Sequence, residues 1–151
     1  MEISGTHHLK LPQRRVWEVL NDPDVLARAT PGVQSLEPDG ESRYRAILDV
    51  AVGPVRGRFE GTVEVCDPSE PDEVTLKVEV QGGPGAVRAQ GRLRLEADGE
   101  NATTVHYQGE VQVTGTLAAV GSRLVVSVAR MQATQFFEQL EREGVPGAVQ
   151  G

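Results

Sequence analysis

Polar and apolar residues alternate with a period of two through most of the chain, which is the pattern of strands with one buried face. Residues 2–11 show it first, with Ile3 and Leu9 on the apolar phase and Thr6 on the polar one. The pattern returns in residues 33–38, 42–52, 55–65, 73–81, 87–95 and 105–113. Short turns separate these segments, so they suit antiparallel neighbours. The pattern predicts an antiparallel sheet of about seven strands with one apolar face.

Two short helices are predicted between the first strand and the others. Pro12 suits the first turn of a helix, and Val16 and Trp17 give that helix an apolar side. Asp22 can cap the second helix, and Pro23 can be its first residue.

Residues 116–142 form the longest segment without proline, and their apolar positions follow helical spacing. The recurring residues are Leu117, Val120, Gly121, Leu124, Val128 and Met131. Steps of three and four place them on one stripe of a helix of ~40 Å, at ~1.5 Å per residue. Phe136 and Phe137 drift off that stripe, and we expect at least one of them at a cavity mouth or beyond the sheet edge. The chain therefore predicts an α+β domain of order β-α-α-β×6-α, in which a long C-terminal helix covers a curved sheet.

Five glycines fall on the apolar phase of the strands, and two interpretations are open. Gly5, Gly57, Gly61, Gly91 and Gly109 either let the sheet bend and bulge or leave volume unfilled beneath the helix. Only 4% of the residues are aromatic, so few large side chains are available to refill that volume. The second interpretation predicts an apolar cavity for a small hydrophobic molecule.

The expected cavity wall comes from the long helix and from the inward phase of the strands. It consists of Leu48, Val50, Phe59, Val63, Val78, Leu93, Tyr107, Val111, Leu117, Val120, Gly121, Leu124, Val128 and Met131. A glycine inside a helix costs ~1 kcal/mol relative to alanine. We interpret Gly121 as a position that admits a strand or a ligand.

Ionisable groups are scarce on the inward phase of the strands, where only His7, Tyr44 and Tyr107 occur. General acid–base catalysis usually needs at least two positioned titratable groups, and a lone histidine on a strand is more often structural. Cys66 has no base beside it in the sequence. The chain also lacks zinc-ligand spacing, a phosphate loop and a nucleophile elbow. We therefore expect no catalytic residues and no metal site.

Charge and cysteine content limit the classes of partner and the cellular compartment that we expect. The net charge of −7 argues against nucleic acid. Cys66 is the single cysteine, which excludes an internal disulfide and suits a reducing compartment. Neither a signal peptide nor an apolar run of ~18–20 residues occurs. We expect a cytoplasmic domain over residues 1–143, with residues 144–151 as the start of a flexible tail.

Several short motifs occur in an order that is specific as a set. They are Pro12 with Val16-Trp17, Leu20-Asn21-Asp22-Pro23, Pro31-Gly32, Val52-Gly53-Pro54-Val55, Gly82-Gly83, Gly121-Ser122-Arg123-Leu124 and Phe136-Phe137. In this order the chain resembles the G-subunit family of carbon monoxide dehydrogenase, within the START/SRPBCC superfamily of helix-grip folds. The resemblance implies a hydrophobic pocket between sheet and helix. It also implies an accessory role beside a molybdenum CO dehydrogenase or related hydroxylase, with recruitment of that enzyme to the inner face of the cell membrane.

Such a dehydrogenase passes electrons to the respiratory chain, so the resemblance leads to a hypothesis about the ligand. The pocket would carry an isoprenoid quinone, menaquinone or ubiquinone, between membrane and enzyme. One alternative is a cyclase- or hydratase-like enzyme with His7 and Tyr107 as acid–base groups. Another is a membrane or assembly adaptor with an incidental cavity. Arg123 and Arg130 would then contact anionic lipid or the partner, although a solvated helix face is the simpler interpretation.

Overall fold

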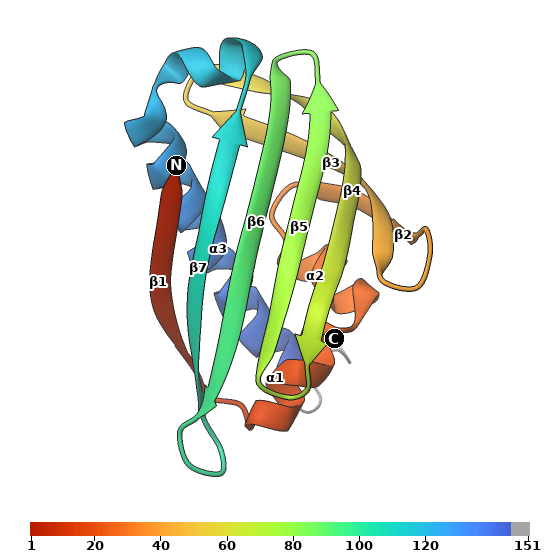
Figure 1. Ribbon diagram of the computed structural model, residues 1–151, viewed down its shortest axis with the longest axis vertical. Helices are drawn as coiled ribbons and strands as arrows, with labels where there is room; N and C mark the ends of the chain where they lie inside the picture. The colour runs from red at the N-terminus through yellow and green to blue at the C-terminus, as the bar shows by residue number, and fades with distance from the viewer. Residues whose placement is uncertain (146–151) are drawn as a thin grey trace.

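Seven strands form one antiparallel sheet in the computed structural model, which describes residues 1–145 (Figure 1). They are β1 (Glu2–Leu9), β2 (Val33–Pro38), β3 (Arg43–Val52), β4 (Val55–Ser69), β5 (Glu73–Gly82), β6 (Gly85–Ala97) and β7 (Thr103–Val113). Their order across the sheet is β1-β7-β6-β5-β4-β3-β2. Consecutive strands from β2 to β7 pair as hairpins, and the last strand, β7, also pairs with the first, β1. The predicted sheet is confirmed.

The helices are α1 (Gln13–Leu20), α2 (Pro23–Ala29), a 3₁₀ helix η1 (Gly115–Val120) and α3 (Ser122–Gly144). The Asp22 carboxylate accepts hydrogen bonds from the backbone N–H groups of Asp24 and Val25. Pro23 follows it in the first turn of α2. The predicted capping of the second helix is therefore confirmed.

The long helix begins at Ser122 rather than at residue 116, so the sequence prediction was wrong over its first turns. Gly121 separates η1 from α3 with a φ of +95°, a backbone conformation that side chains with a Cβ rarely adopt. It therefore lies outside the helix interior. Leu117 and Val120 belong to η1, whose repeat of about three residues per turn imitates helical spacing in sequence.

The strand β4 is longer than its alternation predicts and runs through Cys66 to Ser69. A shift of register between Cys66 and Ser69 interrupts its pairing with β5, and Asp67 has a φ of +46° there. Such a bulge breaks the period of two. The strand therefore continues past its predicted end at residue 65, and Cys66 lies within it.

The helix α3 lies on the inner side of the sheet, with α1 at one end of the molecule and η1 at the other (Figure 1). Its backbone comes closest to β1 and β3 among the strands, so it spans the middle strands between them. The α1-end core comprises buried residues that include Val16, Trp17, Leu20, Leu95, Val105, Phe137 and Leu140. The η1-end core comprises Val52, Phe59, Val80, Val111, Leu117 and Val125. Both ends of the helix are therefore packed.

The C-terminal end of α3 is held by residues near α1 and α2. The Arg15 Nε–H donates to the carbonyl oxygen of Gly144 at 2.9 Å, and Arg28 pairs with Glu143. A Cβ at Gly144 would lie 2.5 Å from Leu11 Cδ1. The helix thus extends into the segment predicted as a tail, of which residues 146–151 lie outside the described part of the chain.

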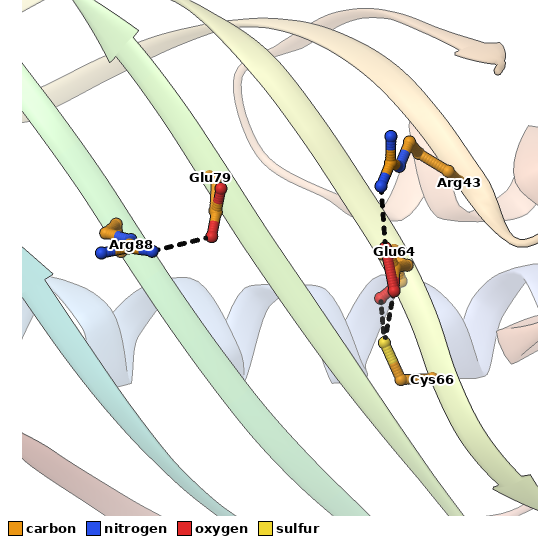
Figure 2. Close-up of polar contacts among 5 residues, drawn as sticks. All are labelled: Arg43, Glu64, Cys66, Glu79 and Arg88. Carbon is orange, nitrogen blue, oxygen red and sulfur yellow. Dashed lines mark hydrogen bonds and ion pairs between the residues drawn. The ribbon is translucent and has the colours of Figure 1, made fainter.

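The outer face of the sheet carries charges of both signs (Figure 2). Arg43 pairs with Glu64 at 3.5 Å, and Arg88 with Glu79 at 3.2 Å. The Cys66 Sγ–H donates to Glu64 Oε1 at 3.0 Å. Burial and the Glu64 carboxylate raise the pKa of Cys66, as expected for an inert thiol. Exposed ion pairs contribute about 0–1 kcal/mol each, so this face is solvated and makes a poor candidate for the site.

Candidate ligand-binding cavity

An apolar cavity of about 370 Å³ lies between the sheet and α3. Its floor is formed by Ala46, Leu48, Val63, Leu76, Val78, Val87, Ala89, Gly91, Leu93, Tyr107, Gly109 and Val111. Its roof is formed by Ala129, Gln132, Ala133, Phe136 and Phe137, and its sides by Ile3, Leu26, Thr30, Pro31, Val33 and Leu36. Members of both cores contribute to this lining. The cavity therefore occupies the middle of the sheet–helix interface, between its two packed ends.

Small residues that face one another explain why this space is unfilled. Gly91 of β6 lies directly opposite Gly109 of β7. In the next inward row, Ala89 lies between Val78 and Val111. A Cβ added at Gly91 would meet no heavy atom within 4 Å. The floor is thus lowest at these facing glycines of β6 and β7.

The five inward glycines divide between the two interpretations of the sequence. At four of them an added Cβ would come within 2.7 Å of a neighbour: Tyr107 at Gly5, Pro84 at Gly57, the Glu79 carbonyl at Gly61 and the Gln90 carbonyl at Gly109. These four serve close packing and sheet curvature. Of the five glycines, Gly91 is the one that leaves open volume, so the cavity interpretation applies to that position.

The strand residues predicted for the wall divide into two groups. Those that line the cavity are Leu48, Val63, Val78, Leu93, Tyr107 and Val111. Phe59 instead belongs to the η1-end core and is completely buried, and Val50 packs against that core. Whether the lining residues contact a ligand remains a prediction.

The helix residues predicted for the wall, all within the described part of the chain, lie outside the cavity lining. Leu117 belongs to the η1-end core, and Val120, Leu124 and Val128 are partly buried and pack against it. Gly121 faces open space. Met131 is 51% exposed, so its predicted place on the inner stripe was wrong.

The cavity roof follows a different stripe of α3 from the predicted one. Ala129, Gln132, Ala133, Phe136 and Phe137 are spaced i, i+3, i+4, i+7 and i+8, which is one helix face. The sequence prediction followed the larger aliphatic residues and gave the alanines no weight. Phe136 and Phe137 lie off the predicted stripe, as expected, and both line the cavity. Phe137 is 2% exposed.

An aromatic cluster closes the α1 end of the cavity. The His7 ring lies 5.8 Å from Tyr107 and 4.7 Å from Phe137, between ring centroids. Burial lowers the pKa of His7, and Glu138 acts in the opposite sense. His7 and Tyr107 stack at an interplanar angle of 18°. A largely neutral imidazole in such a stack serves as a packing group.

A second depression lies on the solvent side of α3 and is open. It is lined by Met1, Glu2, Ser122, Arg123, Val126, Ser127 and Arg130. This is the surface that the adaptor alternative needs. No helix among residues 1–145 is long and apolar enough to cross a membrane, and no group of three or more His, Cys, Asp or Glu side chains in that range could hold a metal ion.

Comparisons with known proteins agree with this architecture. A conserved protein from Geobacillus kaustophilus is 33% identical, with a TM-score of 0.91 over 95% of each chain. A START superfamily protein from Mycobacterium smegmatis is 16% identical, with a TM-score of 0.73 over 93% of this chain and 94% of that one. The ZhuI aromatase/cyclase from Streptomyces sp. R1128 is 16% identical, with a TM-score of 0.69 over 95% of this chain and 93% of that one. The last two show the fold alone.

The predicted START-like helix-grip fold is therefore confirmed. No curated protein matches the chain. A sequence model of the CoxG family, described as the G subunit of carbon monoxide dehydrogenase, matches residues 5–143. The chain belongs to the CoxG family of carbon monoxide dehydrogenase subunits.

Proposed function

We propose that this protein is an accessory subunit that binds a hydrophobic, lipid-like molecule for a molybdenum CO dehydrogenase or a related hydroxylase. The ligand is an isoprenoid quinone, held between the sheet and α3. The observation that carries the proposal is the unfilled apolar cavity of about 370 Å³ in a member of this family. A well-packed core would leave no such space.

The size of the cavity suits part of such a ligand. Ligand pockets range over about 300–1,000 Å³, so this one accommodates a ring system with a short apolar chain. A bicyclic ring comparable to a tryptophan side chain buries about 200–250 Å². At about 25 cal/mol/Å² this gives about 5–6 kcal/mol, equivalent to a Kd of order 0.1 mM. A longer isoprenoid chain would leave through the open side and add affinity there.

The lining supports carriage of a molecule rather than its conversion. Tyr107 is the titratable side chain on the inward phase of the lining, and its neighbour His7 stacks against it. A stacked pair directs its ring faces, rather than its polar atoms, towards one another. The acid–base alternative needs a second titratable group within hydrogen-bond reach of the ligand, and His7 is not among the residues that line the cavity.

Linking the enzyme to the membrane is the second part of the proposal. A quinone resides in the lipid phase, so the protein must meet the membrane surface to collect it. Arg123 and Arg130 line the open depression on the solvent side of α3 and would favour anionic lipid. Sedimentation with anionic liposomes should therefore decrease between low and high ionic strength. Equal sedimentation at both, or none at either, would contradict this part.

Chemical extraction tests the ligand. The protein is purified without detergent, extracted with organic solvent, and the extract is separated by chromatography with ultraviolet and mass detection. We expect one quinone per chain, or saturable uptake of a short-chain quinone by ligand-free protein with a Kd of order 0.1 mM. An extract without quinone, together with no binding on titration, would refute the proposal.

A further inference from the structure

The Gln132 side chain brings a polar amide into the cavity roof, and its chemistry specifies what kind of ligand fits. It extends from the roof formed by α3, where its neighbours in the lining are Ala129, Ala133 and Phe136. Gln132 is half-buried. The side-chain hydrogen bonds among residues 1–145 leave its amide without a protein partner.

The other polar residues of the lining are already engaged or directed elsewhere. The Thr30 hydroxyl donates to the carbonyl oxygen of Leu26 at 2.7 Å. The Tyr107 ring lies over Gly5, where an added Cβ would meet its hydroxyl at 2.7 Å, so that hydroxyl points towards β1 and away from the floor centre. The amide of Gln132 therefore remains for a ligand.

Gln90 and Glu110 reach the cavity in a different way. Both are exposed residues on the outward phase of their strands, and both also line a depression on the outer face of the sheet. They adjoin the facing glycines Gly91 and Gly109, where no side chain covers the backbone. Their contribution to the lining is thus that of the main chain, whose N–H and C=O groups pair within the sheet.

We infer that Gln132 is the specificity-determining residue of the cavity and binds an oxygen atom on the ring of an otherwise apolar ligand. A glutamine amide offers two donors and one acceptor and carries no charge. Its N–H can donate to a ring carbonyl, and after rotation its oxygen can accept from a ring hydroxyl. One side chain would therefore hold both a quinone and the corresponding quinol, as a carrier requires. This inference rests on the proposed function and specifies its ligand.

A pair of ligands that differ only in their ring oxygens separates this contact from apolar burial. The probes are 2,3-dimethyl-1,4-naphthoquinone, which has no free ring position for thiol addition, and 2,3-dimethylnaphthalene. Their binding is measured by calorimetry on the wild-type protein, Gln132→Leu and Gln132→Met. The matched control is Gln135→Leu, which changes an exposed glutamine on the same helix.

We expect Gln132→Leu and Gln132→Met to weaken quinone binding about 3- to 10-fold, the effect of one lost hydrogen bond. Hydrocarbon binding should stay equal or become tighter, and Gln135→Leu should change neither. An equal loss for both probes, or no loss for the quinone, would overturn the inference. Wild-type protein that binds both probes equally would also overturn it while leaving the hydrophobic cavity intact. Wild-type protein that binds neither would overturn the proposed function as well.

Discussion

Replacing Gly91 with leucine puts a side chain into the cavity from its floor. The position accepts one because an added Cβ meets nothing within 4 Å, and the backbone there lies outside the left-handed region. The cavity of about 370 Å³ has room for the remaining carbon atoms. We therefore expect Gly91→Leu to fold, to be more stable than the wild type, and to bind ligand poorly.

The gain in stability follows from the burial of the new side chain. Each buried CH₂ contributes about 0.8 kcal/mol, so a leucine side chain contributes at most about 3 kcal/mol. Loss of the strand glycine adds about 0.5–1 kcal/mol, and ordering the side chain costs about as much. A net gain of about 2–3 kcal/mol corresponds to an increase in Tm of about 4–12 °C for a chain of this size.

Thermal unfolding and quinone titration measure the two effects on the same sample. Affinity should fall at least about tenfold, since a ligand that loses the burial of two CH₂ groups loses about 1.6 kcal/mol. A variant with an unchanged or lower Tm and unchanged affinity would refute the cavity as described. It would mean that the space above Gly91 is closed in solution.

The facing glycine provides the matched control for this experiment. Gly109 lies opposite Gly91 and also lines the cavity, but its added Cβ would lie 2.7 Å from the Gln90 carbonyl oxygen. Gly91→Ala should stabilise the fold by about 0.5–1 kcal/mol. Gly109→Ala should destabilise it by about 1–3 kcal/mol because backbone must move. Effects of the same sign would contradict the geometry.

Three further predictions concern positions outside the cavity. Gly121→Ala should lower the free energy of unfolding by about 1–3 kcal/mol and leave ligand affinity unchanged. If urea unfolding gave this variant the same free energy of unfolding as the wild type, the positive φ at Gly121 would be contradicted. The stability of the wild type should decrease as pH falls below about 6.5. Burial lowers the pKa of His7 in the folded chain in spite of Glu138, so the unfolded chain binds a proton at His7 more readily than the folded chain does. His7→Phe should reduce that slope in pH-dependent unfolding curves, and an identical slope would rule out this cause. Burial and Glu64 raise the pKa of Cys66, so Cys66 should react with iodoacetamide at pH 8 more slowly than free cysteine does. Its reaction should be faster in the Glu64→Gln variant than in the wild type. A wild-type rate equal to that of free cysteine would count against the contact between Cys66 and Glu64.

Local features of the fold could be predicted from the sequence. Alternation fixes which face of each strand is buried, and it located all seven strands because each one has a single apolar side. The Asp22-Pro23 start of α2 is a local hydrogen-bonding and φ requirement. Such determinants lie within a few residues of the element they specify.

The phase of α3 could not be obtained from spacing alone. Leu117 and Val120 continue the apolar pattern into a 3₁₀ helix, and only the φ of Gly121 reveals the interruption. The prediction therefore counted helical spacing from residue 117, in η1, rather than from the start of α3. This placed Met131 on the buried face of the helix. The alanines at 129 and 133 gave no apolar signal of comparable size, although they form the roof.

The cavity floor depends on contacts between strands. Gly91 and Gly109 are equivalent in the sequence pattern, yet one faces open space and the other a carbonyl oxygen. That difference is set by how the neighbouring backbone curves, which is a tertiary property. The sequence could predict that a cavity exists, but which glycine opens it required the structure.

Native mass spectrometry of the protein as purified tests the central claim most directly, because it reports bound mass and stoichiometry together. We expect one apolar ligand of quinone mass per wild-type chain, released on collisional activation, and a ligand-free Gly91→Leu variant prepared in parallel. Wild-type protein that remains ligand-free after incubation with membrane lipid extract would contradict the claim. Equal ligand occupancy in the wild type and in Gly91→Leu would place the ligand outside the cavity and contradict it too.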